Sequence, residues 1–139
     1  MRQVLRGSRG GTWGPLLIGV YSVGMIGAGI FYPDPVPGLP PGTPASATAI
    51  SGRGLMHFSV ATIGFLALIA ACFVWARRFA AQQRLRWVAY SVVTGALFFI
   101  AFAGEASGQL FLNPAFVFTA LNAFIWVSVM ALLLLTERA

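Results

Sequence analysis

The sequence predicts an all-α fold, a polytopic transmembrane helical bundle with four spans. The first observation is four long apolar segments without Asp, Glu, Lys or Arg, at residues 15–32, 54–76, 87–104 and 114–135. A bilayer core about 30 Å thick needs roughly 20 apolar helical residues to cross it. The second observation is composition, because only 9% of residues are charged, against about 25% in soluble domains. We therefore expect residues 1–139 to form a single membrane domain.

The basic residues lie at the ends of the apolar segments and predict their orientation. All nine cations are arginines, and the net charge is +6. Eight of them fall on one side, namely Arg2, Arg6, Arg9, Arg77, Arg78, Arg84, Arg86 and Arg138, and Arg53 falls on the other. Short arginine-rich loops stay in the cytoplasm. We predict a multi-pass protein of a prokaryotic cytoplasmic (plasma) membrane with both termini cytoplasmic, in contact with the lipid bilayer and not with nucleic acid.

The first segment, residues 15–32, begins at a proline that a first helical turn tolerates. Gly24 and Ala28 lie one turn apart in it, and such small pairs let helix backbones approach closely in lipid. Similar pairs are Ala67/Ala71, Ser91/Gly95 and Thr119/Ala123. They predict tight helix packing, within the chain, with another copy of it or with another membrane protein.

The connections have distinct characters. Six of the eight prolines fall in residues 33–44, which predicts an extended, non-helical outer loop because proline has no backbone donor and a fixed φ. Residues 77–86 are expected to form a short interfacial stretch between the second and third segments. A polar turn follows the third segment, and Asn113-Pro114 opens the fourth.

The predicted topology brings polar residues from several segments to the outer end. They are Asp34, Arg53, His57, Glu105 and Asn122, with Gln109 and Asn113 nearby. One interpretation is a small outer cavity in which His57 binds a proton or acts as a general base, oriented by Asp34 or Glu105. The alternative is structural: solvated acids at helix ends, Arg53 paired with one of them, His57 bonded to a neighbouring helix, and Asn122 joining two helices.

Several kinds of chemistry are disfavoured. Cys72 is the single cysteine, so it forms no disulfide within the chain and is expected to be a packing residue. A haem held by two histidines from this chain is excluded, because His57 is its single histidine. His57, Asp34 and Glu105 are possible metal ligands by type but lack a ligand spacing pattern, so we expect no metal and no cofactor. No acidic or basic residue lies at mid-depth in the four segments to relay protons or ions.

Three stretches of the chain, Trp13–Pro44, Gly54–Ala80 and Ala89–Gly108, carry a family resemblance. Their most specific parts are the Asp-Pro with a Pro/Gly-rich loop at Asp34–Pro44 and the Gly-x-x-His at Gly54–His57. On these residues the chain resembles the prokaryotic integral-membrane family catalogued as domain of unknown function 998. The resemblance implies a helical bundle in the cytoplasmic membrane, without an assigned activity, and marks Asp34 and His57 as motif residues. Members usually carry two further spans before the segment matching Trp13, so the resemblance implies a shortened member.

Three functions stay open at this point. The first is an integral membrane module that acts through helix packing or interaction. The second is a small-molecule binder or transporter component that uses the outer polar patch, and the third is a membrane enzyme that uses His57 with Asp34 or Glu105. The second and third predict that His57 and Asp34 approach within a few ångströms in a partly buried pocket.

Overall fold

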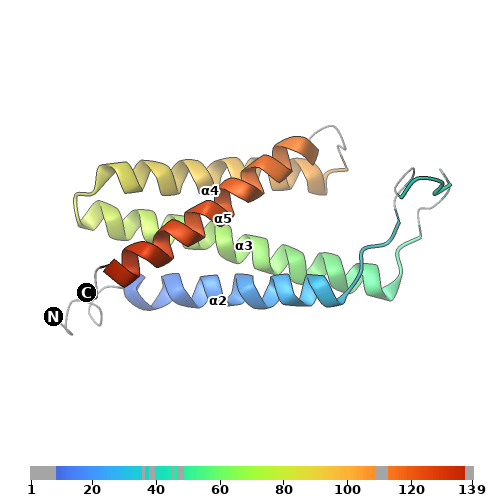
Figure 1. Cartoon of the computed structure of the whole chain (residues 1–139), viewed down its shortest axis with the longest axis horizontal. Coiled ribbons are helices and arrows are strands. Elements are labelled where there is room, and N and C mark those ends of the chain that lie inside the picture. The colour runs from blue at the N-terminus through green and yellow to red at the C-terminus, as the bar shows by residue number, and fades with distance from the viewer. Residues whose placement is uncertain are drawn as a thin grey trace. The chain divides into compact units, whose positions relative to one another are not determined.

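The structure, a computed structural model, describes residues 9–35, 37, 40–44, 46, 49–108 and 113–136. This part of the chain contains four helices and no strand: α2 (Arg9–Ile30), α3 (Gly52–Ala81), α4 (Leu85–Ala106) and α5 (Asn113–Thr136) (Figure 1). All four are long and apolar enough to cross a membrane. The predicted fold class, an all-α transmembrane protein with four spans, is confirmed, and the chain is a multi-pass membrane protein.

All the helix ends differ from the expected spans by one residue or more, and the largest difference is at the start of α2, which begins at Arg9 and not at residue 15. Helix α2 ends at Ile30, because residues directly before Pro33 are pushed out of the helical region. Helix α3 continues to Ala81, five residues past the expected end of its span. Phe79, which is only 1% exposed, holds this extra turn against the protein. The expected interfacial stretch is thereby reduced to residues 82–84.

The chain divides into two compact units. One comprises Met1–Ile18 with Leu66–Ala139, and the other comprises Gly19–Phe65. We call the first the four-helix unit and the second the hairpin unit. Helices α2 and α3 run without interruption from one unit into the other. The single membrane domain over residues 1–139 stays a prediction.

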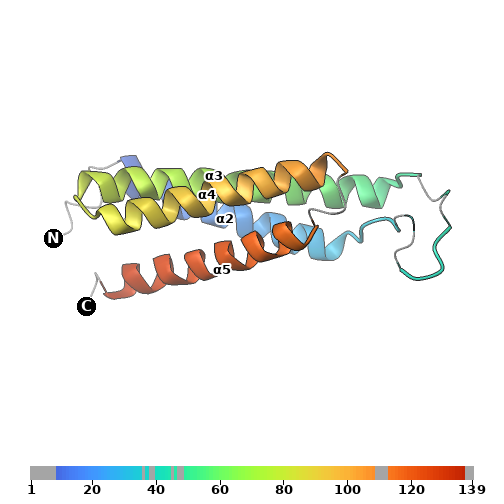
Figure 2. The same cartoon turned by 90° about the horizontal axis from the view of Figure 1, so that it is seen from above.

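The four-helix unit has an up-and-down arrangement. The start of α2, the end of α5 and the turn between α3 and α4 lie at the same end of this unit (Figures 1 and 2). Its core consists of side chains that are at most 2% exposed: Leu68, Ala71, Cys72, Trp75, Phe79, Phe98, Ala123, Trp126 and Met130. Cys72 is a free, buried cysteine in this core, as expected for a packing residue.

Polar pairs join α4 to α5 inside this unit. The Trp126 indole Nε1 donates to Ser91 Oγ at 3.0 Å, and Asn122 Nδ2 donates to Thr94 Oγ1 at 3.0 Å. Ser91 and Thr94 are almost completely buried. A buried hydroxyl in hydrocarbon has no water to bond, so each needs a partner. The two bonds therefore set the register of the antiparallel pair.

The hairpin unit depends on close backbone contact between α2 and α3. A Cβ added at Gly24 would lie 2.8 Å from Gly64 Cα and 2.8 Å from the Val60 carbonyl oxygen. In the four-helix unit, a Cβ at Gly95 would lie 2.9 Å from Cys72 Cβ. The expected close packing is thus confirmed at Gly24 and Gly95, and at both positions the partner helix belongs to the same chain.

The outward surfaces of the helices are apolar. Val23 on α2 is 70% exposed, and Phe118 on α5 is 73% exposed. Such surfaces would aggregate in water but suit contact with lipid chains. The exposed faces therefore agree with a bilayer as the surrounding solvent.

Candidate functional site

The five expected site residues divide between the two units. Asp34, Arg53 and His57 belong to the hairpin unit, and Glu105 and Asn122 belong to the four-helix unit. Gln109, expected near the same patch, lies outside the described residues. The candidates therefore form two separate groups, one in each unit.

Asp34 is bonded to the residue that precedes α3. Its Oδ1 accepts a hydrogen bond from the Ser51 hydroxyl at 2.6 Å, and its Oδ2 accepts one from the Ser51 backbone N–H at 2.7 Å. Ser51 Oγ in turn accepts from the Gly54 N–H at 3.1 Å, so Ser51 is the N-cap of α3. The side-chain bond, followed by the backbone bond, lowers the pKa of the Asp34 carboxyl below its usual range.

Gly54 makes this arrangement possible. A Cβ at Gly54 would overlap Asp34 Oδ2 and would lie 2.6 Å from Asp34 Cγ. Any larger residue would therefore displace the carboxylate from the N-terminus of α3. This contact links the two motif segments, because the Asp-Pro aspartate lies directly against the glycine of Gly-x-x-His.

His57 is bonded to the end of α2. Its Nδ1 lies 2.9 Å from the Ala28 carbonyl oxygen and 2.7 Å from the Phe31 carbonyl oxygen. Both oxygens can only accept, so Nδ1 carries the proton and donates to the pair. Ala28 is among the last residues of α2, whose carbonyls have no partner within the helix. His57 therefore caps the C-terminus of α2.

The two motif residues act at opposite helix ends. Asp34, which follows α2, caps α3 through Ser51, whereas His57, which lies in α3, caps α2. Among the described residues no hydrogen bond joins Asp34 to His57. The sequence left two interpretations of His57 open, one in which a carboxylate orients it and one in which it bonds to a neighbouring helix. The structure shows two backbone carbonyls of residues 28 and 31 at Nδ1.

The remaining atom of interest in the hairpin unit is His57 Nε2. In a neutral ring that carries its proton on Nδ1, Nε2 is an acceptor. It makes no hydrogen bond with the described part of the chain. Arg53, in the first turn of α3, is exposed and forms no ion pair with Asp34. His57 Nε2 is thus an acceptor atom of the motif residues that no described group occupies.

The other two candidates join α4 to α5 in the four-helix unit. Glu105 Oε1 accepts from Asn113 Nδ2 at 3.2 Å, and Asn122 is bonded to Thr94. Glu105 Oε2 is buried and has no hydrogen-bond partner in the described part of the chain. Among the described residues no group of three His, Cys, Asp or Glu side chains gathers that could hold a metal ion.

Two residues of the hairpin site were absent from the expected set. Ser51 was signalled by its type, since serine is among the preferred N-cap residues and it directly precedes α3. Gly54 stood in the quoted motif, but only the approach of Asp34 shows why a side chain is excluded there.

A family model described as "Protein of unknown function (DUF998)" matches residues 1–135 of the chain. Comparison with curated proteins and with solved structures gives no match.

Proposed function

The chain belongs to the DUF998 family of proteins of unknown function. We propose that it is a membrane-embedded structural and interaction module. The observation that carries the proposal is the reciprocal capping of α2 and α3 by the two motif residues. Asp34 and His57 are bonded to Ser51 and to two backbone carbonyls respectively, which are contacts that stabilise a helical hairpin.

The capped hairpin holds the proline-rich segment that the module would present outside the hydrocarbon. The bonds between Asp34 and Ser51 join the two ends of this loop. Within it, the Thr43 N–H donates to the Pro40 carbonyl at 3.1 Å, and Gly42 has a φ of +93°. This is the pattern of a β-turn that needs glycine at its third position. The turn at residues 40–43 is already formed, so a partner that binds it has less conformational entropy to remove there.

For partners inside the membrane, the exposed surface of α2 is the available face. Gly24 already contacts α3, but a Cβ added at Gly19 or at Gly29 would have no heavy atom within 4 Å. A second copy of the chain or another membrane protein could approach α2 closely there. This supports the interaction part of the proposal, and cross-linking from Gly19→Cys in membranes would test it.

We place the arginine-rich end of the four-helix unit in the cytoplasm of a prokaryotic cell, so that both termini are cytoplasmic. The start of α2, the end of α5 and the α3–α4 turn share one end of that unit (Figure 1), and basic turns stay inside. A periplasmic-enzyme reporter fused after the C-terminus should be inactive, and a fluorescent reporter that folds only in cytoplasm should be active.

The structural role of the motif is tested with matched variants of His57. In His57→Asn the side-chain Nδ2 replaces Nδ1 as the donor, and Nε2 is removed. In His57→Ala both are removed. We expect His57→Asn to keep most of the thermal stability of the purified protein and His57→Ala to lose it. If His57→Ala and Ser51→Ala unfold at the same temperature as wild type, the structural proposal is wrong.

A second candidate is a small-molecule binder or transport component that uses His57 Nε2. A membrane enzyme would use the same atom. The observation that favours it is the acceptor atom His57 Nε2, since Nδ1 is occupied by the Ala28 and Phe31 carbonyls. Here His57→Asn would abolish activity while preserving stability. Loss of a cellular phenotype in a stable His57→Asn protein would therefore favour this candidate over the first.

A further inference from the structure

Two arginines near the turn between α3 and α4 differ from their neighbours. Arg77 lies on α3 and Arg86 lies in the first turn of α4, and both side chains are exposed. Within the part of the chain that the structure describes, neither makes a hydrogen bond, an ion pair or a ring contact. Arg78 and Arg84, in contrast, lie over aromatic rings of the same unit. The guanidinium groups of Arg77 and Arg86 are therefore not used to hold this end of the protein together.

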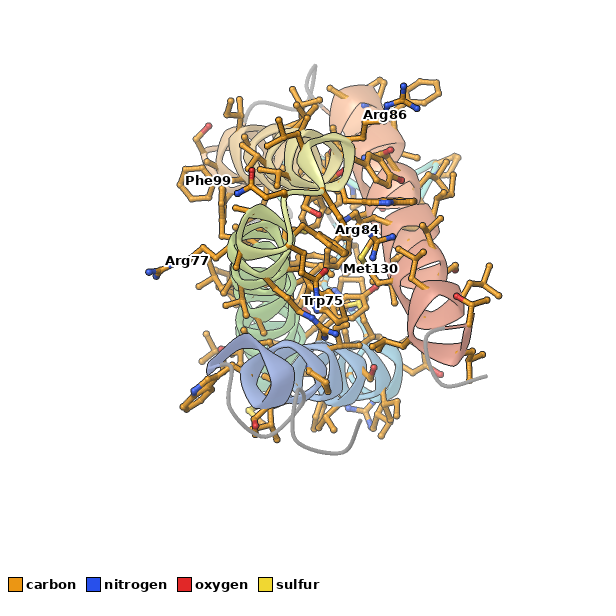
Figure 3. The ribbon with its side chains drawn as sticks, turned by 90° about the vertical axis from the view of Figure 1, so that its left-hand side faces the viewer. Trp75, Arg77, Arg84, Arg86, Phe99 and Met130 are labelled. Carbon is orange, nitrogen blue, oxygen red and sulfur yellow. The ribbon has the colours of Figure 1, made fainter. Side chains whose placement is uncertain are left out.

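Both side chains point outward from the four-helix unit. In Figure 3, Arg77 and Arg86 extend away from the helices, whereas Trp75 and Met130 lie between them. Arginines near the ends of membrane helices extend their charged group to the headgroups while their carbon chains follow the apolar surface. The two guanidinium groups thus face the surroundings of the protein at the border of the hydrocarbon.

Each of these arginines lies at the end of an apolar helix face. On α3, Phe73 is one turn before Arg77 and is 40% exposed. On α4, Val93 and Leu97 are two and three turns after Arg86 and are 53% and 50% exposed. Residues at these spacings share one face of a helix, and exposed apolar faces of membrane helices contact lipid chains. A molecule beside either face therefore meets apolar side chains along the helix and a cation at its end.

A phospholipid has the matching arrangement of groups, with acyl chains below a phosphate. A guanidinium can donate two parallel hydrogen bonds to a phosphate, and its charge persists at all physiological pH values. A soluble phosphate would contact the guanidinium alone, without the apolar face. In a zwitterionic lipid the cation of the headgroup offsets the attraction of the phosphate. The arrangement therefore favours a phospholipid with a net negative headgroup.

We propose that Arg77 and Arg86 each bind the phosphate of an anionic phospholipid, as two separate contacts in the leaflet around this end of the four-helix unit. The proposal is independent of which leaflet this is, and it does not rest on the roles of Asp34 and His57. It assigns a headgroup class to the lipid that surrounds the protein at this end.

The test uses the full chain in lipid nanodiscs that contain a phosphatidylglycerol with a photoreactive group on its headgroup glycerol. After illumination, mass spectrometry maps the labelled residues around Arg77 and around Arg86. Unlabelled phosphatidylglycerol and phosphatidylcholine are added separately as competitors. In wild type we expect phosphatidylglycerol to compete about fivefold better at both positions, the effect of one arginine at an anionic membrane surface.

The two arginines provide matched controls for each other. Arg77→Gln should lose the preference for phosphatidylglycerol at its own position and keep it at Arg86. Arg86→Gln should do the reverse. Both substitutions remove one exposed guanidinium from the same end of the unit, so they change the net charge equally.

Three outcomes would overturn the proposal. The first is an equal loss at both positions in either single variant, which would mean that only the general charge of the protein attracts the lipid. The second is equal competition by phosphatidylglycerol and phosphatidylcholine in wild type, a measurement that needs no variant to fold. The third is loss of labelling on addition of inorganic phosphate equimolar with the lipid, which would assign the arginines to a soluble anion.

Discussion

Asp34 and Ser51, 17 positions apart in the sequence, are joined by two hydrogen bonds that use both oxygens of the carboxylate. This pair closes the loop between α2 and α3 at the point where α3 begins. Because Ser51 also caps α3 through Gly54, one carboxylate ties the exit of the first helix to the entry of the second. The motif aspartate is thus explained by helix-end chemistry.

The Asp34 carboxylate should make hairpin stability depend on acid pH. Its bonds to Ser51 lower its pKa from an unfolded value near 3.8, so the folded state favours the ionised form. The stabilisation is complete above the unfolded pKa and is lost as pH falls through the lowered folded pKa. Thermal unfolding in detergent should show this loss for wild type. Asp34→Asn should lack it, and a ¹³C titration that places the pKa of the Asp34 carboxyl at or above 3.8 would contradict the assignment.

Gly54 and Gly52 form a matched pair for testing the approach of Asp34. Gly54→Ala would push the carboxylate off Ser51 and weaken the N-cap, at a cost of about 1 kcal/mol or more. At Gly52 an added Cβ meets no atom within 4 Å, so Gly52→Ala should leave the unfolding temperature unchanged. Equal effects of the two substitutions would show that the contact does not matter.

The sequence predicts the number and type of the helices better than it predicts the contacts between individual residues. The four apolar segments are sufficient for the four helices, because crossing hydrocarbon leaves few other backbone solutions. Gly24 is correctly assigned to close packing because small residues mark helix contacts in lipid, but its partner Gly64 is not identifiable from spacing within one helix.

The details of the polar residues are harder to predict. Asp34 and His57 are recognisable as special, yet a residue type does not reveal whether its partner is a side chain or a backbone carbonyl. The two carbonyls that bond His57 come from the end of α2, 29 and 26 positions away. Arg84 is similar, because its guanidinium carbon lies 5.4 Å from the Phe79 ring centroid. This position depends on a left-handed residue before it, and Gln83 is not the glycine that usually signals one.

The hydrogen bonds of His57 predict its tautomer. Because Nδ1 faces two carbonyl oxygens, the neutral ring should carry its proton on Nδ1, whereas free imidazoles favour Nε2. For the neutral ring, long-range ¹H–¹⁵N correlation of ¹⁵N-histidine protein should show a protonated Nδ1 and an unprotonated Nε2. This is the only histidine in the sequence, so the signal needs no assignment. A spectrum with the proton on Nε2 would contradict the capping role.

Gly24 and Gly19 test the helix contact of the hairpin unit. In Gly24→Ala the new methyl would meet backbone atoms of Gly64 and Val60 at 2.8 Å, and backbone cannot move aside without separating α2 from α3. We expect a loss of about 1–3 kcal/mol, typical of overpacking. Gly19→Ala, in open space on the same helix, should be neutral or stabilising. Chemical denaturation in mixed micelles compares them, and equal stability of both variants would rule out the close contact.

Substitution of Gln83 by glycine should raise the stability of the protein, whereas the contact-disturbing substitutions above should lower it. A residue with a side chain pays conformational strain at a φ of +57°, about 1 kcal/mol relative to glycine. Gln83→Gly removes this strain and loses only an exposed bond of 3.3 Å from Gln83 Nε2 to the Ala80 carbonyl. The unfolding temperature should therefore rise. Gln82, its neighbour, is not in the left-handed region, so Gln82→Gly should lower stability. If Gln83→Gly is as destabilising as Gln82→Gly, the turn does not hold Gln83 in the left-handed conformation, and the placement of Arg84 over Phe79 loses its structural basis.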